Sequence, residues 1–134
     1  MNISFNKRFL FFLLICFLIY LQGIFKLPVM DRDEARFATA SKTMLIEKDF
    51  IDIKMVEEKR YKKPIGIYWT QSLMNSIFGS YPYDKISIYR LPSILGVFIS
   101  FFLIFVIIRN IENESIAFLT VFFLIFSFLT ISEI

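Results

Sequence analysis

The stretch LPSILGVFISFFLIFVII, residues 91–108, contains no charged side chain and ends directly before Arg109. An α-helix needs about 20 consecutive apolar residues, with a lower limit of roughly 17, to cross the hydrocarbon core of a bilayer. Pro92 fits such a helix, because a proline in the first turn removes only a backbone N–H that has no helical partner. Residues 91–108 are therefore predicted to form a transmembrane helix.

Two further apolar runs accompany this one. FLFFLLICFLIYLQGIF, residues 9–25, is uncharged, and it predicts a span at about 9–27. A cleaved signal peptide is the alternative, but no pair of small residues marks a cleavage site after it. The third predicted span, at about 115–132, follows the short polar turn RNIENES, which makes the last two spans antiparallel neighbours. We expect an all-α integral membrane protein with about three transmembrane helices.

Composition agrees with this fold class and excludes several functions. The 134 residues are 57% hydrophobic and include 18 Phe, and these residues are concentrated in the apolar runs. A net charge of +3, dispersed along the chain, argues against a nucleic-acid partner. The absence of His excludes Ser-His-Asp and Cys-His nucleophilic systems, so acid–base chemistry must rest on Asp, Glu, Lys or Tyr. The single Cys16 cannot form an internal disulfide.

Residues 28–90 form a long loop that is predicted to carry two amphipathic juxtamembrane helices. We expect the first helix over residues 34–47, an extended stretch over 48–58, and the second helix over 64–78. Pro64 suits the first turn of the second helix, and Gly79 suits the position just after it. This helix is expected to lie at the lipid surface because of its apolar and aromatic side chains. These are Ile65, Tyr68, Trp69, Leu73, Ile77 and Phe78.

The positive-inside rule gives the expected orientation. Lys7 and Arg8 precede the first span, and Arg109 lies between the second and the third. Cations at these positions predict a cytoplasmic N-terminus and an outward-facing loop.

Two charged features stand in the loop, and each has two interpretations. Asp31, Asp33 and Glu34 can cap a helix, with Arg36 as an i,i+3 partner of Asp33. The turn EEKRYKKP, residues 57–64, can bind anionic lipid headgroups. Together, however, carboxylates and a cation-rich helix N-terminus at one membrane surface are what transfer from a lipid phosphate requires. The cations hold the phosphate, and a carboxylate accepts the proton of an attacking hydroxyl or orients it.

The ordered series DRDEARFATASKTMLIEKDFIDI, RYKKPIGIYW, FG and YRLPSILG resembles the N-terminal part of polytopic polyprenyl-phosphate-sugar glycosyltransferases of GT-C architecture. These include the bacterial aminoarabinose transferases of lipid A and the protein O-mannosyltransferases. The resemblance implies an incomplete GT-C fold for this chain, because such enzymes have many more spans. We therefore expect the N-terminal portion of such an enzyme, with the remainder of a split enzyme as one possible partner.

The resemblance also implies roles for individual residues. Asp33, with Glu34 beside it, matches the catalytic acidic motif, and Lys63 matches the Lys that binds the donor phosphate. Arg36 matches an Arg that steers Asp33 or a phosphate. Lys62 is a further candidate for the donor phosphate, and it departs from aminoarabinose transferases, which often have an acidic residue there. No cofactor and no dedicated metal-ligand set are evident, although carboxylates could bind a divalent cation.

The expected function is transfer of a sugar from a polyprenyl-phosphate donor to lipid A or another periplasmic acceptor. The expected location is the bacterial inner membrane, with membrane lipid as a partner and the N-terminus cytoplasmic. Two alternatives remain open at this point. The chain is an inactive remnant of such an enzyme, or it is a small membrane scaffold protein that binds anionic lipid through its basic turn.

Overall fold

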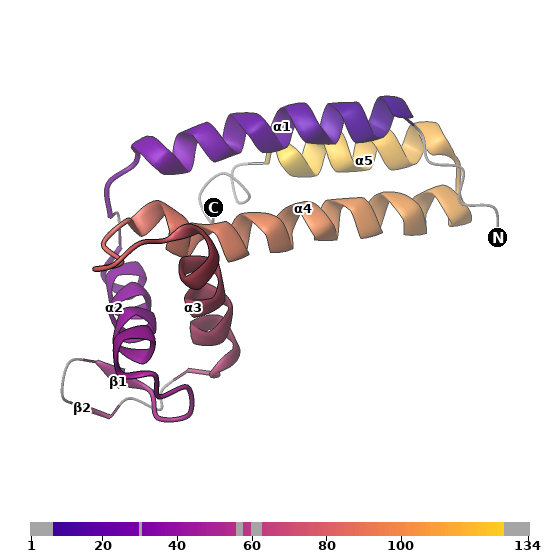
Figure 1. The fold of residues 1–134 in the computed structure, drawn as a ribbon. Helices are drawn as coiled ribbons and strands as arrows, with labels where there is room; N and C mark the ends of the chain where they lie inside the picture. The colour runs from indigo at the N-terminus through magenta and orange to yellow at the C-terminus, as the bar shows by residue number, and fades with distance from the viewer. Residues whose placement is uncertain (1–6, 30, 56–57, 60–62, 128–134) are drawn as a thin grey trace. The chain divides into compact units, whose positions relative to one another are not determined.

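The computed structural model describes residues 7–29, 31–55, 58–59 and 63–127, and these are mostly helical (Figure 1). The elements are α1 (Lys7–Lys26), α2 (Arg32–Glu47), β1 (Lys54–Met55), β2 (Glu58–Lys59), α3 (Gly66–Phe78), α4 (Ile86–Ile111) and α5 (Glu114–Ile125). The chain divides into two compact units. Met1–Phe25 and Ser93–Ile134 form one, called the apolar unit here, and Lys26–Pro92 form the other, called the loop unit.

Two helices are long and apolar enough to cross a membrane, namely α1 and α4. They correspond to the first two predicted spans, and α4 begins at Ile86, five residues before the expected start. The apolar helix α5 has 12 residues in the described part of the chain. That length is about 18 Å, less than the roughly 30 Å of a bilayer core. Residues 128–132 of the third predicted span lie outside the described residues, so this span stays a prediction.

Aromatic rings hold the apolar unit together. Phe9 of α1 stacks on Phe105 of α4, with ring centroids 3.6 Å apart. Phe17 meets Phe98 edge to face at 5.2 Å. A polar contact joins α1 to the end of α5, where the Tyr20 hydroxyl donates a hydrogen bond of 2.6 Å to the carbonyl of Ile125. Many other large apolar side chains of this unit are exposed, as expected where lipid replaces water.

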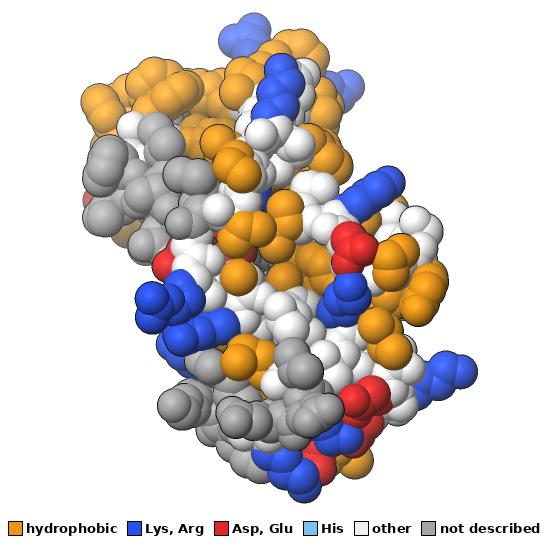
Figure 2. All heavy atoms as spheres, turned by 90° about the vertical axis from the view of Figure 1, so that its left-hand side faces the viewer, with side chains coloured by type: hydrophobic (Ala, Val, Ile, Leu, Met, Phe, Trp, Pro, Cys, Tyr) orange, Lys and Arg blue, Asp and Glu red, His pale blue; other side chains and the backbone are white. Residues whose placement is uncertain are grey.

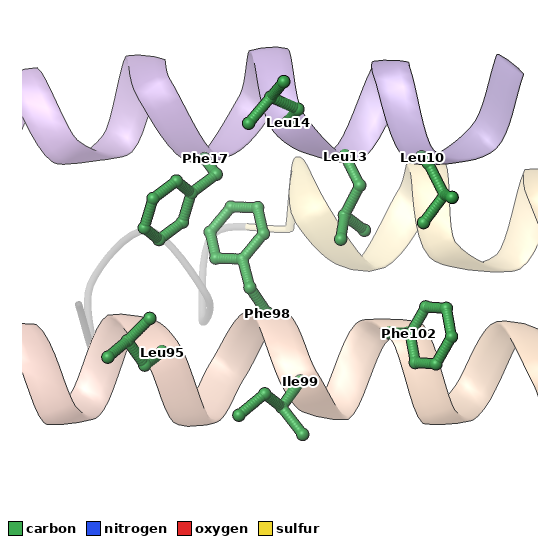
Figure 3. A pocket seen from close by; sticks show the side chains of 8 residues that line it. All are labelled: Leu10, Leu13, Leu14, Phe17, Leu95, Phe98, Ile99 and Phe102. Atoms are coloured by element: carbon green, nitrogen blue, oxygen red, sulfur yellow. The ribbon is translucent and has the colours of Figure 1, made fainter. Parts of the chain in front are cut away.

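An apolar groove of about 340 Å³ lies between α1 and α4 within the same unit (Figure 3). All of its lining side chains are hydrocarbon in character, so it offers no group that could bind a phosphate or a sugar hydroxyl. Its lining comprises Leu10, Leu13, Leu14, Phe17, Leu95, Phe98, Ile99 and Phe102.

The loop unit is built around α2 and α3, which lie side by side and run in opposite directions (Figure 1). The first expected helix is confirmed, and it starts at Arg32, two residues earlier than predicted. It ends at Glu47, and the next residue, Lys48, adopts a left-handed conformation with φ 56°. The expected extended stretch contains a short antiparallel hairpin of β1 and β2, with Met55 opposite Glu58.

The second expected helix is confirmed as α3, but its faces differ from the expected pattern. Tyr68 is only 1% exposed, because its ring packs against Phe37 and the apolar core around Met44. The prediction that Tyr68 lies against lipid was therefore wrong. Trp69, Leu73 and Ile77, which follow one another at i,i+4 spacing, are exposed.

Apart from Tyr68, the buried residues of α3 are polar. The Ser41 hydroxyl of α2 donates to Gln71 Oε1 at 2.8 Å, and Gln71 Nε2 donates to the carbonyl of Tyr89 at 3.2 Å. The Ser72 hydroxyl donates to the carbonyl of Ser41 at 3.1 Å. A helix with polar residues inside and apolar residues outside is suited to apolar surroundings rather than to water.

Gly79 ends α3 as predicted, but not for the expected conformational reason. Its φ is −91°, which any residue can adopt, and its N–H donates to the carbonyl of Asn75 at 2.9 Å. A Cβ atom at this position would lie 2.5 Å from the same carbonyl oxygen. Glycine is therefore required by close packing against the last turn of the helix rather than by a left-handed turn.

Candidate active site

The first turn of α2 presents two neighbouring carboxylates. Asp31 occupies the N-cap position with extended backbone, and its carbonyl accepts the N–H of Ala35 at 3.2 Å. The Asp31 side chain makes no capping hydrogen bond, so the expected role of this side chain as a cap was wrong. Asp33 and Glu34 follow in the first turn, where the positive end of the helix dipole stabilises negative charge.

Asp33 forms the predicted i,i+3 ion pair with Arg36. Arg36 Nη1 donates to Asp33 Oδ1 at 2.9 Å. The Asp33 side chain is 47% exposed and that of Arg36 is 37% exposed, so a ligand can reach both. A carboxylate, a guanidinium and the start of a helix thus occur together at an accessible place. This combination can orient a hydroxyl through Asp33 and bind a phosphate oxygen through Arg36.

Glu34 lies in different surroundings, although it is the next residue. Successive residues of a helix are rotated by about 100°, so neighbouring side chains leave the helix in different directions. Glu34 forms a two-bond ion pair with Arg90 of α4 through Arg90 Nε and Nη2, the latter at 3.0 Å. The Arg90 side chain is only 8% exposed, and that of Glu34 is 22% exposed.

Arg90 also donates hydrogen bonds to backbone carbonyls of the described residues. Its Nη1 donates to the carbonyl of Leu27 at 2.8 Å, and its Nη2 donates to the carbonyl of Pro28 at 2.7 Å. These carbonyls belong to the segment that connects α1 to α2. Within the loop unit, the guanidinium therefore links the start of α4, to which it belongs, to this connection and to the first turn of α2.

Arg90 lies in the sequence motif YRLPSILG, but no role was predicted for it. A signal was available, since Arg90 is a lone cation at the beginning of an otherwise uncharged run. A charged side chain at the edge of an apolar helix usually has a buried partner. The sequence could not show which of the loop carboxylates that partner is.

The predicted cationic residues lie elsewhere. Lys62 falls outside the described residues, and Lys63 is exposed directly before α3 begins. Because α2 and α3 are antiparallel, the start of α3 lies near the end of α2 (Figure 1). Lys63 comes just before the start of α3, whereas Asp33 belongs to the first turn of α2. Helix α2 has 16 residues and is therefore about 24 Å long. The structure brings Asp33 and Arg36 together, but it does not bring Lys63 beside them.

Charged side chains of both signs are interspersed over the loop unit (Figure 2). Lys59 of the basic turn pairs with Asp52 at 2.7 Å, and Lys54 pairs with Glu47 at 2.7 Å and with Asp49 at 3.5 Å. Backbone N–H groups of Asp52 and Ile51 lower the pKa of Asp49, with Lys54 adding to the effect. Carboxylates thus already balance part of the basic charge around the hairpin.

Among the described residues, no group of three or more His, Cys, Asp or Glu side chains is arranged to hold a metal ion. The described part of the chain thus combines two apolar helices of membrane-spanning length with a loop unit that carries charges of both signs.

Comparison with known proteins identifies the family. The sequence profile of the dolichyl-phosphate-mannose-protein mannosyltransferase family matches residues 62–132, more than half of the chain. The chain therefore belongs to this family of GT-C glycosyltransferases. The match includes Lys62, Lys63 and Arg90, and it begins after Asp33 and Arg36.

Two relatives are both described as undecaprenyl phosphate-alpha-4-amino-4-deoxy-L-arabinose arabinosyl transferase 2. The one from Proteus mirabilis is 29% identical over 87 residues, 64% of this chain and 15% of the relative. The one from Pseudomonas fluorescens is 29% identical over 103 residues, 76% of this chain and 17% of the relative. The chain thus spans less than a fifth of the length of these relatives. No solved structure matches it.

Proposed function

We propose that this chain supplies the first outer loop of an enzyme that transfers a sugar from a polyprenyl-phosphate donor to an acceptor. The family match carries this proposal, and the names of both relatives specify an undecaprenyl-phosphate-linked sugar. The acceptor is lipid A or another molecule at the outer face of the bacterial inner membrane. The chain forms the N-terminal part of a GT-C transmembrane domain, with spans at about 9–27, 91–108 and 115–132 and a cytoplasmic N-terminus.

The reaction is an inverting substitution at the anomeric carbon of the sugar. An acceptor oxygen forms the new bond to this carbon, while the bond from the carbon to the donor phosphate oxygen breaks. Polyprenyl phosphate leaves with the electron pair of that bond. Asp33 accepts the proton of an acceptor hydroxyl, or orients the acceptor when it is a phosphate that is already ionised. Glu34 was predicted beside Asp33 as a second catalytic carboxylate.

Arg36 is the phosphate-binding cation that the geometry favours, because it already contacts Asp33. Lys63 and Lys62 are also assigned to the donor phosphate by their place in the motif. Lys63 comes just before the start of α3, so its proposed contact can be tested separately from that of Arg36. We expect Lys63→Ala to raise the KM for the donor and to leave kcat nearly unchanged. An unchanged KM would remove Lys63 from the site.

The distribution of side chains on α3, with apolar residues exposed and polar residues buried, supports a location of this helix at the membrane surface. Its exposed residues Trp69, Leu73 and Ile77 present an apolar stripe, and the buried ones are hydrogen-bonded to α2. Trp69 Nε1 also donates to the carbonyl of Phe50 at 2.7 Å, which leaves the indole ring available for the lipid interface. In this proposal α2 and α3 are the juxtamembrane helices of the outer loop.

The test uses the whole protein as its gene encodes it, reconstituted in vesicles with a synthetic polyprenyl-phosphate sugar. Asp33→Asn should reduce the rate of sugar release by about 10²-fold or more, the usual contribution of a positioned acid–base group. Asp31→Asn is the matched control, since Asp31 is an exposed neighbouring carboxylate without a side-chain cap bond. Near-normal turnover of Asp33→Asn would contradict the assignment of this residue.

The same experiment separates the alternatives. An inactive remnant would release no sugar with any variant. A scaffold protein would also release none, and its binding to vesicles of anionic lipid would fall when Lys59 and Lys63 are neutralised. The existing ion pair of Lys59 with Asp52 weakens the scaffold interpretation, because that cation is partly balanced within the chain.

A further inference from the structure

We infer that Arg90 is a positioning residue, which, through Glu34, fixes the first turn of α2 and so places the carboxylate of Asp33. This inference rests on the proposed function for its catalytic consequence, but its structural part can be tested without turnover. It also separates the roles of the two neighbouring carboxylates. Asp33 faces the substrate, and Glu34 holds the helix that carries Asp33.

The geometry of the guanidinium supports this role. Its donors are directed to the Glu34 carboxylate and to the carbonyls of Leu27 and Pro28. An Arg side chain has five donors in a rigid planar fork, which suits simultaneous binding of a carboxylate and adjacent carbonyls. Lysine has a single ammonium group and cannot reproduce this planar arrangement. The contact therefore depends on the shape of the guanidinium and not only on its charge.

The surroundings of the contact indicate support rather than substrate binding. Ser87, Ile88, Tyr89 and Arg90 are all buried where α4 begins. The Tyr89 hydroxyl donates to the carbonyl of Tyr83 at 2.9 Å, and its own carbonyl accepts from Gln71. The start of α4 is thus fixed to both α3 and the loop before it. Arg90 extends the same framework to α2.

The first turn of α2 depends on this support. The N-cap residue Asp31 contributes no side-chain hydrogen bond to the helix. The segment before it is exposed from Lys26 to Val29, and Arg90 anchors two of its carbonyls. Without Arg90, the turn that carries Asp33 would lose the ion pair between Glu34 and this guanidinium, and the preceding connection would lose its hydrogen bonds to the same group.

The test compares Arg90→Lys and Glu34→Gln with Arg109→Lys in the whole protein. Arg109 is the matched control, because it also lies on α4 and contacts a glutamate, Glu114, at 3.8 Å. Hydrogen exchange of the backbone amides in residues 31–36 is measured for each variant, whether or not the protein turns over. Exchange should become faster in the Arg90 and Glu34 variants, with α3 and the Arg109 variant unchanged. Arg90→Lys tests the shape of the group without removing its charge, so it remains informative if Arg90→Ala fails to fold.

Kinetics then distinguish positioning from substrate contact. Small displacements of a catalytic group can reduce a rate by about 10²-fold, so kcat should fall strongly in Arg90→Lys while the donor KM changes little. The double variant Arg90→Lys, Glu34→Gln should be no worse than Arg90→Lys alone, because Arg90→Lys already disrupts the contact with Glu34 and also removes the planar fork that binds the carbonyls of Leu27 and Pro28. Unchanged exchange in residues 31–36 would overturn the structural part of the inference. Faster exchange with a normal kcat, or an effect on KM alone, would overturn the positioning role.

If neither the wild-type protein nor any variant releases sugar, the proposed function fails. The hydrogen-exchange result then still decides whether Arg90 fixes the first turn of α2.

Discussion

In the apolar unit, helices meet through aromatic rings, such as Phe9 on Phe105, whereas in the loop unit they meet through hydrogen-bonded side chains such as Ser41 and Gln71. Lipid tails are as apolar as the side chains of α1, so burial of those side chains inside the unit gains little over contact with lipid. The contacts of the loop unit have definite donors and acceptors, and a wrong arrangement leaves them unpaired. Single substitutions should therefore have larger and more local effects in the loop unit.

The largest contrast is expected between two glycines. Gly79→Ala in the loop unit places a Cβ atom 2.5 Å from a backbone carbonyl oxygen, so the end of α3 must move. We expect a loss of about 3 kcal/mol in the free energy of unfolding, at the upper end of the range for overpacking. Gly23→Ala in α1 meets no atom within 4 Å and should stabilise the helix by up to about 1 kcal/mol. Denaturant titration of the detergent-solubilised whole protein measures both values, and equal effects would contradict the comparison.

A smaller contrast is expected between two serines. Ser41→Ala removes the donor to Gln71 Oε1 in a buried contact and should cost about 1–3 kcal/mol. Ser100→Ala, in the exposed part of α4, removes only a bond to the carbonyl of Gly96 within the same helix. We expect this control to remain within about 0.5 kcal/mol of the wild type. The same titration applies, and a neutral Ser41→Ala would mean that the polar network does not specify the packing of α2 on α3.

The smallest effect concerns the pH dependence of the hairpin region. Because backbone N–H groups lower the pKa of Asp49 below its ordinary 3.8 in the folded chain, this carboxylate stabilises the fold above that pH. The contribution is lost as the pH falls through the lowered pKa, when the folded form becomes protonated. Asp49→Asn should therefore remove part of the acid sensitivity of amide exchange in residues 49–55. Identical pH profiles for the variant and the wild type would contradict this.

The apolar unit was largely predictable from the sequence, and the loop unit only in part. Uncharged runs are sufficient to locate α1 and α4, because length and hydropathy alone decide whether a helix can span a bilayer. The start of α4 was placed too late, since Ser87 and Arg90 are buried through tertiary contacts that hydropathy does not record. In α2, the spacing of Asp33 and Arg36 was enough to predict their ion pair.

The missed part of the site is a long-range contact. Glu34 and Arg90 are 56 residues apart in the sequence, and periodicity carries no information about which distant residues meet. Adjacent residues in a motif also suggest a shared role, although helix geometry directs Asp33 and Glu34 into different surroundings. The order of the motifs indicated the family, but the different ion-pair partners of these two carboxylates could be seen only in the structure.

The most direct test of the different roles proposed for these two carboxylates is hydrogen exchange of residues 31–36 in Asp33→Asn and Glu34→Gln, measured on the same preparations as sugar release. The account predicts that Asp33→Asn reduces sugar release by about 10²-fold or more with normal exchange. It predicts that Glu34→Gln accelerates exchange and reduces release as a consequence. Normal exchange in Glu34→Gln together with abolished release would contradict the account, because Glu34 would then act on the substrate itself.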